Sequence, residues 1–254
     1  MPASLPPMTY CGPPPLPDDV WGRWNFDPVL MTVMAVCAGL FLLSRDTPKH
    51  GRASLVAGMV MLGVIFISPL CALTVALFSA RVVHHVLLVA VAAPLLAWAL
   101  IHHGRSRWSA AINALPGVLT PALVLHTAIF WLWHAPDAYV LALSSTPVYW
   151  LMQTTLLLSA MLFWAAALQA SPGRAIAGLV GISIQMGLLG ALLVFSNQPL
   201  YAPHFTTTQA FGMTPETDQQ LSGLIMWVPA SLPYLLVAIV RLGSWLRQSE
   251  ARRA

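Results

Sequence analysis

The sequence predicts an all-α membrane protein, a polytopic helical bundle of about seven transmembrane helices. Of its 254 residues, 58% are hydrophobic and only 8% are charged, and the mean hydropathy is +0.74. Soluble domains carry roughly 25% charged residues, so this composition does not suit a water-soluble globule. Apolar runs of about 20 residues, the length that crosses a bilayer, recur along the chain. Such runs satisfy their backbone hydrogen bonds as helices and are too long for barrel strands.

Seven apolar runs can be counted, of which the first and fourth are the shortest. They are Pro28–Leu43, Ala53–Leu77, Val82–Ile101, Val118–His134, Val148–Gln169, Arg174–Phe195 and Leu221–Leu246. We therefore expect a Pro-rich tail over residues 1–27, a seven-helix membrane domain over 28–247 and a basic tail over 248–254. The first tail lacks the basic and apolar regions of a signal peptide, so the first helix is expected to serve as an uncleaved insertion signal.

The basic residues predict the orientation of the chain. Only Arg23 and Arg81 fall on one side of the predicted membrane. The other side holds Arg45, Lys49, Arg52, Arg105, Arg107, Arg174, Arg241, Arg247, Arg252 and Arg253. Because positive residues concentrate in cytoplasmic loops, we expect the N-terminus outside and the C-terminus in the cytoplasm. The net charge of +4 reflects this bias, and no basic patch interleaved with aromatic residues indicates a nucleic-acid partner.

Histidines gather near the predicted outer ends of the helices. His84 and His85 open the third run, His134 ends the fourth, and His204 and Asp218 belong to the last outer loop. Ionisable residues at membrane depth are costly and usually functional, and imidazole is a common ligand of copper, zinc and iron. We therefore expect these five residues to form a metal site, with copper as the candidate ion. Since adjacent helical residues point about 100° apart, His84 and His85 cannot both face it.

Structural interpretations compete with this one. A histidine at a helix end can extend toward the lipid headgroups, as Trp and Tyr do. Thr217 or Asp218 can cap the seventh helix. Small residues at four-residue spacing in the sixth run, such as Ser183 and Gly187, predict that this helix packs closely in the bundle.

Sulfur-containing side chains give a weaker signal. Cys37 and Cys71 are expected to pack inside the helices, and Cys11 is expected to lie outside without a partner. No CxxC motif indicates a thiolate metal site. Met213 and Met226 flank the start of the seventh run, and soft sulfur ligands favour Cu(I).

Four short motifs, taken in order, resemble those of the CtaG family of polytopic cytochrome c oxidase assembly proteins. They are APLL in the third run, WLWHAP around His134, QPLY in the last outer loop and DQQLSGLIMWVP from Asp218. The resemblance covers most of the chain, from about the second helix to the seventh. It implies a non-enzymatic protein of the bacterial inner membrane that assembles a haem–copper terminal oxidase, with oxidase subunits as partners. A role in supplying copper is a further implication.

The resemblance also implies roles for residues that match the family's motifs. His85 matches the second histidine of an H-x-x-Q-H pattern, and His134 matches the histidine of W-x-W-H-x-P. The other matching positions are Trp133, Pro136, Asp218, Gln219, Gly223, Met226 and Trp227. Arg81 stands where the first histidine of H-x-x-Q-H is expected, and His84 replaces its glutamine. Either His84 compensates for that histidine or the site is altered.

Three functions are therefore open. The leading one is an assembly factor that holds copper or docks an oxidase subunit at its outer face. The second is a copper transport or tolerance protein, with His126 as a ligand deeper in the fourth helix. The third is a b-type haem protein in which His85 pairs with His134 or His126. The chain has no Walker A, GxGxxG, GxSxG or HExxH motif, so nothing indicates an ATP-driven pump or a hydrolase.

Overall fold

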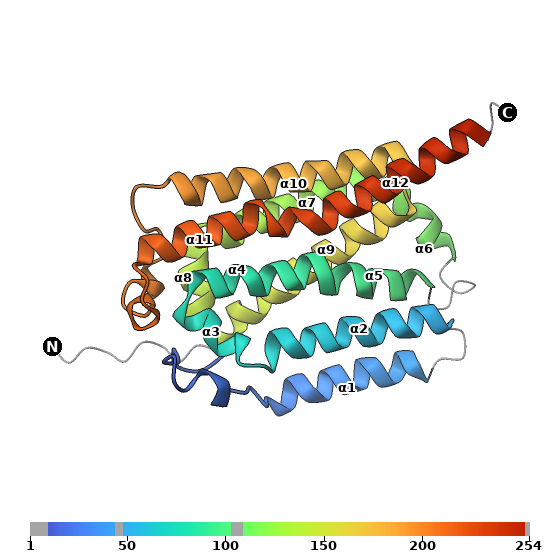
Figure 1. Ribbon diagram of the computed structural model, residues 1–254. Coiled ribbons are helices and arrows are strands. Elements are labelled where there is room, and N and C mark those ends of the chain that lie inside the picture. The colour runs from blue at the N-terminus through green and yellow to red at the C-terminus, as the bar shows by residue number, and fades with distance from the viewer. Residues whose placement is uncertain (1–9, 44–47, 103–108, 252–254) are drawn as a thin grey trace.

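The structure, a computed structural model, describes residues 10–43, 48–102 and 109–251. Within these ranges the chain is helical and forms no strand, which confirms the predicted all-α class. Figure 1 shows the long helices lying side by side along one direction. Five of the basic residues that predict the orientation lie outside the described ranges, namely Arg45, Arg105, Arg107, Arg252 and Arg253.

The main helices follow one another with short connections. In chain order they are α1 (Pro28–Leu42), α2 (Lys49–Phe66), α3 (Leu70–Ala76), α4 (Phe78–Val86), α5 (Ala93–His102), α6 (Ser109–Ala114), α7 (Leu119–His134), α8 (Pro136–Ser144), α9 (Thr146–Gln169), α10 (Pro172–Phe195), α11 (Pro215–Trp227) and α12 (Leu232–Ala251). A π-helical segment, η2 (Leu87–Ala92), joins α4 to α5. The 3₁₀ turns are η1 (Val20–Gly22), η3 (Leu115–Val118), η4 (Ala202–His204), η5 (Thr208–Phe211) and η6 (Pro229–Ser231).

Among the described residues, five segments are long and apolar enough to cross a membrane, and the chain is a multi-pass membrane protein. These segments are Phe78–His102, Ala111–His134, Thr146–Gln169, Pro172–Phe195 and Pro215–Ala251. α2 and α3 form a further pair bent by 43°, and Pro28–Phe41 is a shorter apolar helix. These segments correspond to the seven apolar runs, while the count of seven crossings and the orientation stay predictions.

Proline marks the start of many of these helices. Pro28, Pro136, Pro172 and Pro215 occupy the first positions of α1, α8, α10 and α11, where the missing backbone N–H has no helical partner to lose. At α1 the side chain of Asp27 accepts the N–H of the next two non-proline residues, as a helix cap does. The proline pattern therefore sets where each helix enters the bundle.

Connections at one end of the bundle are more ordered than the sequence indicated. The residues between the second and third apolar runs belong to the first turn of α4, because the chain breaks at Leu77, whose backbone is extended. The connection after His134 contains α8, and α11 already begins at Pro215. In Figure 1 the segment from residue 10 to 27, α3, α8 and the start of α11 all lie at this end.

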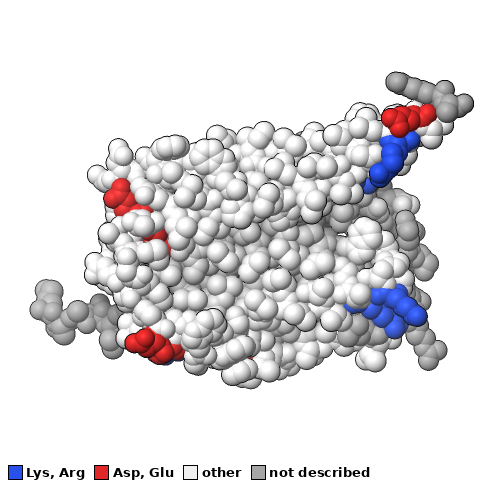
Figure 2. All heavy atoms as spheres, viewed as in Figure 1, with Lys and Arg blue, Asp and Glu red and all other residues white. Residues whose placement is uncertain are grey.

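Charged side chains gather at the two ends of the bundle. On the face shown in Figure 2, Lys and Arg lie where α2 begins and α12 finishes, and Asp and Glu lie mainly at the opposite end. Between them the surface is uncharged, and large apolar side chains such as Leu40, Leu158 and Leu236 are exposed. An apolar belt between charged ends is what a lipid-facing surface requires.

The segment before α1 folds back over the end of the bundle that was predicted to be outside. Cys11 forms a disulfide bond with Cys71 at the start of α3, so the expectation of an unpaired Cys11 and a merely packing Cys71 is wrong. The Tyr10 ring stacks on Tyr149 with centroids 5.0 Å apart, and the Tyr10 hydroxyl donates to Asp27 at 2.6 Å. These contacts bring Cys11 to Cys71. Cys37, also expected to pack, is exposed on α1.

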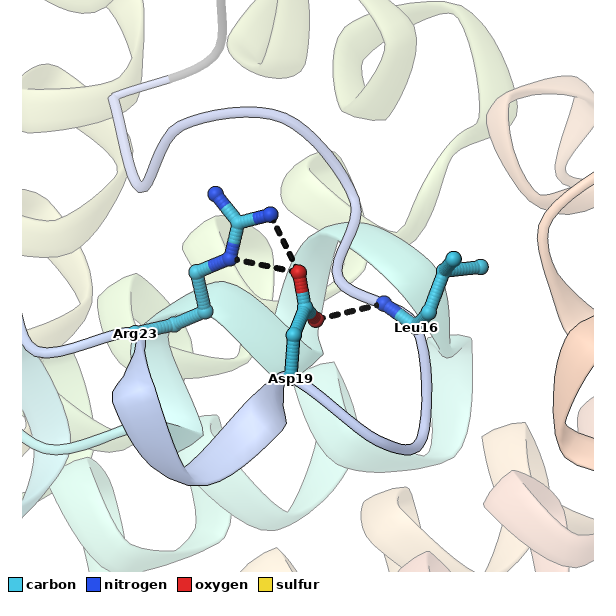
Figure 3. Close-up of polar contacts among 3 residues, drawn as sticks. All are labelled: Leu16, Asp19 and Arg23. Carbon is cyan, nitrogen blue, oxygen red and sulfur yellow. Dashed lines mark hydrogen bonds and ion pairs between the residues drawn. The ribbon is translucent and has the colours of Figure 1, made fainter.

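Asp19 and Arg23 shape the exposed part of this segment (Figure 3). The Asp19 carboxylate accepts a hydrogen bond from Arg23 Nε at 3.0 Å and another from the Leu16 N–H at 2.8 Å. Both partners of this ion pair are about two-fifths exposed, and exposed ion pairs add little stability. The disulfide and the partly buried Tyr10 contacts therefore hold the segment in place.

Alkylation under denaturing conditions tests the disulfide. Without reductant we expect one alkyl group per chain, on Cys37, and with reductant we expect three, since the chain has three cysteines. A Cys37→Ser variant should carry no alkyl group without reductant and two alkyl groups with reductant. Intact-protein mass spectrometry counts the groups. Three groups on the unreduced wild-type protein would contradict the bond.

Candidate functional site

Helices α4 and α7 bring His85 and His134 together. Both side chains are buried, and their ring centroids lie 6.0 Å apart with the planes at 78°. Nδ1 of His134 is 2.7 Å from the carbonyl oxygen of Phe130. Because a carbonyl oxygen only accepts, Nδ1 carries the proton, and Nε2 keeps its lone pair.

Gln153 on α9 gives His85 a similar constraint. The amide Nε2 of Gln153 is 3.4 Å from His85 Nε2, while Gln153 Oε1 and His85 Nδ1 have no hydrogen-bond partner among the described residues. If the Gln153 amide is turned by 180°, its oxygen takes the place of its nitrogen. His85 Nε2–H then donates to the Gln153 oxygen, and His85 Nδ1 keeps its lone pair. Each imidazole then has one nitrogen fixed and one free, as metal-bound histidines do.

A cavity of about 20 Å³ is lined by both histidines. Two sulfur-containing side chains, Met186 of α10 and Met226 of α11, line it as well, and the remaining walls are Val, Leu and Phe. One water-sized particle needs roughly 10–15 Å³ measured in this way. The cavity therefore admits a single small ion or water molecule.

His84 faces away from this cavity. Its ring packs edge-on against Phe66 of α2 with centroids 5.1 Å apart, and neither ring nitrogen has a hydrogen-bond partner among the described residues. The His84 and His85 rings nevertheless stay neighbours, at 5.6 Å. This confirms that two adjacent histidines on one helix serve different surroundings.

Asp218 caps a helix other than its own. Its carboxylate accepts the backbone N–H groups of Phe78 at 2.6 Å and Ser79 at 3.1 Å, and it also accepts the Ser79 hydroxyl. These groups form the N-terminus of α4. The sequence-based prediction that Asp218 or Thr217 caps the seventh helix is wrong, because α11 begins earlier and Thr214 accepts the Thr217 N–H as its cap.

His204 lies with the outer loop, apart from the histidine pair. Its Nε2 is 2.7 Å from the hydroxyl of Tyr139, and its ring lies near Phe78. Burial, followed by the positive charge of Arg81, lowers the pKa of His204 to about 4. Burial also raises the pKa of Tyr139 to about 12. Both groups are therefore neutral at physiological pH, and they share one hydrogen bond between the tyrosine hydroxyl and the imidazole Nε2.

The five predicted metal-site residues thus divide into two places. His85 and His134 face the cavity with His84 beside them, whereas His204 and Asp218 hold the outer loop and the start of α4. In the part of the chain that the structure describes, no three or more His, Cys, Asp or Glu side chains are grouped so that they could hold a metal ion. A metal at the cavity has two imidazoles at its disposal and needs further ligands of another type.

Arg81 adds a buried positive charge one turn before His85. Its side chain is 1% exposed and forms no ion pair with any described residue. One guanidinium nitrogen donates to the Thr74 carbonyl at 3.3 Å, and Arg81 Cζ lies 5.4 Å from the Tyr149 ring centroid. The cation is thus stabilised by a carbonyl dipole and an aromatic face, and its field reaches the histidine pair.

Gln219 fixes the outer loop beside the site. Its Oε1 accepts the Leu200 N–H at 2.7 Å, and its Nε2 donates to the Gln198 carbonyl at 3.2 Å. The hydroxyl of Tyr201 in turn donates to the His134 carbonyl at 2.8 Å. The QPLY and DQQ motifs therefore form one hydrogen-bonded unit with the end of α7.

Gly223 allows two helices to approach very closely. A Cβ atom on Gly223 would lie 2.6 Å from the Gly190 carbonyl oxygen, and one on Gly190 would lie 2.7 Å from the Gly223 carbonyl oxygen. No side chain fits there, so α10 and α11 cross in backbone contact. Trp227 covers the neighbouring Gly187.

The remaining motif positions are structural. Trp133 donates its indole N–H to the Thr155 hydroxyl at 2.9 Å, and Pro136 occupies the first position of α8. These contacts fix the end of α7 and with it the position of His134.

A family model described as cytochrome c oxidase caa3 assembly factor matches residues 34–248. The chain belongs to this family. The match spans most of the membrane helices, as the resemblance of the short motifs implied, and cytochrome c oxidase assembly is accordingly the function of the protein. Comparisons with curated proteins and with solved structures gave no match.

The assembly factor also has candidate residues that the sequence analysis missed. Met186 lines the cavity, Gln153 orients His85, and Gly190 receives Gly223. Small residues marked α10 as a packed helix, but nothing in the local sequence distinguishes Met186 from the other ten methionines. A disulfide between Cys11 and Cys71 could have been suspected from the sequence, since Cys11 belongs to the tail predicted to be outside and Cys71 lies near the outer end of the second apolar run.

An Asp218→Asn variant of the assembly factor should be less stable. The amide keeps one acceptor oxygen but loses the charge that strengthens three hydrogen bonds to the start of α4, so we expect the free energy of unfolding to fall by about 1–3 kcal/mol. Thermal unfolding in detergent measures the loss. Glu216→Gln, an exposed change on the same helix turn, is the matched control. Equal stability of the two variants would argue against the cap.

His204 should make the assembly factor sensitive to mild acid. Its pKa is about 4 in the folded protein and about 6.5 when unfolded, so between these values only the unfolded chain takes up a proton. Stability is therefore lost as the pH falls from 6.5 toward 4, by about 2 kcal/mol at pH 5. His204→Gln should flatten the pH dependence of thermal unfolding by that amount, whereas exposed His50→Gln should leave it unchanged. An equally steep profile for His204→Gln would refute this assignment.

Proposed function

We propose that this assembly factor works in the bacterial cytoplasmic membrane and holds a copper ion between His85 and His134 for the haem–copper oxidase. It binds and hands over the ion and performs no catalysis, and its partners are oxidase subunits. The observation that carries the proposal is a pair of buried imidazoles, each with one constrained nitrogen, on a cavity that fits one ion. Such a pair has the usual features of metal-bound histidines.

The distribution of charged residues and the position of the disulfide support a site near the periplasmic end of the bundle. The disulfide between Cys11 and Cys71 lies at the end of the bundle from which α4 starts, and disulfides persist in oxidising compartments such as the periplasm. The opposite end carries Lys49 and Arg247, as expected for cytoplasmic loops. Copper held near the first end is on the side where extracytoplasmic subunits of an oxidase can receive it.

The size of the cavity favours an ion over a haem group. A space of about 20 Å³ has no room for a porphyrin between His85 and His134. His126, the alternative haem ligand and the deeper ligand of a transport path, does not line the cavity, and its Nδ1 is 2.9 Å from the Ser159 hydroxyl. Holding copper at one end of the bundle thus agrees better with the geometry than haem binding or transport does.

Copper analysis of the purified protein tests the proposal. After loading with Cu(I) in the presence of ascorbate, we expect about one copper per wild-type chain. The His85→Ala/His134→Ala variant should retain almost none, because no other described group replaces two imidazoles. His50→Ala, which changes an exposed histidine at the opposite end, should bind as the wild type does.

The copper content of the oxidase assembled in cells separates delivery from docking. Cells that make the double-histidine variant should assemble an oxidase with less copper than cells that make the wild type or His50→Ala. An oxidase with full copper content in all three strains would overturn the proposal and leave the assembly role to protein–protein contact.

A further inference from the structure

We infer that Met186 and Met226 complete this site, which makes it a four-ligand Cu(I) site with one ligand from each of α4, α7, α10 and α11. The inference rests on the proposed copper function and specifies its ligand set and oxidation state. Both methionines are almost fully buried, at 4% and 2% exposure, and both line the cavity that His85 and His134 line. Among the described residues that line the cavity, these four are the only ones with nitrogen or sulfur in their side chains.

The chemistry of this ligand set favours Cu(I). Thioether sulfur is a soft ligand that selects Cu(I), whereas zinc and other divalent ions favour carboxylates, thiolates and more imidazoles. None of the described residues that line the cavity is Asp, Glu or Cys. Methionine side chains are also flexible, so they can close around an ion and release it again, as a delivery site requires.

The spacing of the two imidazoles fits a shared metal ion. Metal–nitrogen bonds of about 2.0 Å, added to the radius of each ring, place the two centroids about 5 Å apart around a tetrahedral ion and about 6 Å apart on opposite sides of an ion. The His85 and His134 centroids lie 6.0 Å apart. A four-coordinate ion between these rings therefore requires the two rings to approach each other by about 1 Å.

The buried charge of Arg81 points to a monovalent ion. Arg81 precedes His85 by four residues on α4, so the two side chains share one face of the helix. The repulsion between this guanidinium and a bound cation is proportional to the charge of the ion. A divalent ion at the cavity is therefore penalised about twice as much as Cu(I).

The contact between Gly190 and Gly223 places the two methionines. Met186 lies one turn from Gly190 on α10, and Met226 lies three residues from Gly223 on α11. Because the two backbones touch at the glycines, the methionines are held close to the same cavity. The small residues at the crossing thus bring two thioethers together with two imidazoles.

Substitution of both methionines by leucine tests the inference. Leucine preserves the volume and apolarity of methionine, so the fold should be retained, while the sulfur ligands are lost. In competition with a Cu(I) chelator we expect the Met186→Leu/Met226→Leu variant to bind Cu(I) at least about tenfold more weakly than the wild type. Met152→Leu, a buried change on α9 outside the cavity, should have no effect.

Copper K-edge absorption supplies a readout that a merely structural role would not change. The wild type and Met152→Leu should show copper–sulfur scattering, and the double-methionine variant should show nitrogen ligands only. The wild type should also bind Cu(I) more tightly than Zn(II). The Arg81→Gln variant should show a smaller ratio of Cu(I) affinity to Zn(II) affinity.

The possible failures are distinguishable. A wild-type protein that takes up no copper would overturn the proposed copper function and this inference with it. Copper that depends on His85 and His134 but shows no sulfur scattering, with unchanged affinity in the double-methionine variant, would overturn the inference alone. Loss of sulfur scattering together with weaker Cu(I) binding in that variant supports it.

Discussion

The carboxylate of Asp218 fixes the depth at which two site helices meet. It sits on α11, yet it accepts the first N–H groups of α4, which lack partners within their helix and carry its positive dipole end. From this junction both helices run into the bundle. His85 follows Phe78 by seven residues and Met226 follows Asp218 by eight, which correspond to about 10 Å and 12 Å along a helix axis. One capping interaction therefore brings an imidazole and a thioether to nearly the same level.

The lateral positions of α10 and α7 in the bundle depend on the backbone contact between α10 and α11 and on the outer loop. The crossing of Gly190 and Gly223 leaves no space for a side chain, so α10 cannot shift away from α11 without losing that contact. Gln219 binds the loop that leads from α10 to α11, and Tyr201 from that loop binds the His134 carbonyl. Within the DQQLSG motif, Asp218 contacts α4, Gln219 contacts the outer loop and Gly223 contacts α10. A short motif can therefore position a site that is built from helices distant in the sequence.

The helical class, the apolar runs that form helices and the family could all be predicted from the sequence. Hydropathy and short motifs are properties of residues that are neighbours along the chain, so they can be read without the structure. The sequence was also sufficient to show that His84 and His85 face different surroundings, since helix geometry alone decides that. It could not reveal that Asp218 caps α4 rather than its own helix, or that Met186 meets His85. Those contacts join residues about 100 or more positions apart, and the pattern around each residue has simpler local explanations, such as a cap or core packing.

The presence of Arg81 at a position where the resembled motif has a histidine gains a physical meaning in this arrangement. In the H-x-x-Q-H pattern that the chain resembles, the first histidine stands four residues before His85 and so shares its helix face. A third imidazole at that position would suit a divalent ion. A buried guanidinium instead removes a ligand and adds a positive charge, and both changes act against a divalent ion. In the proposed copper site, the thioethers of Met186 and Met226 supply the missing ligands without negative charge. A soft, monovalent ion is the cation that such a site tolerates best.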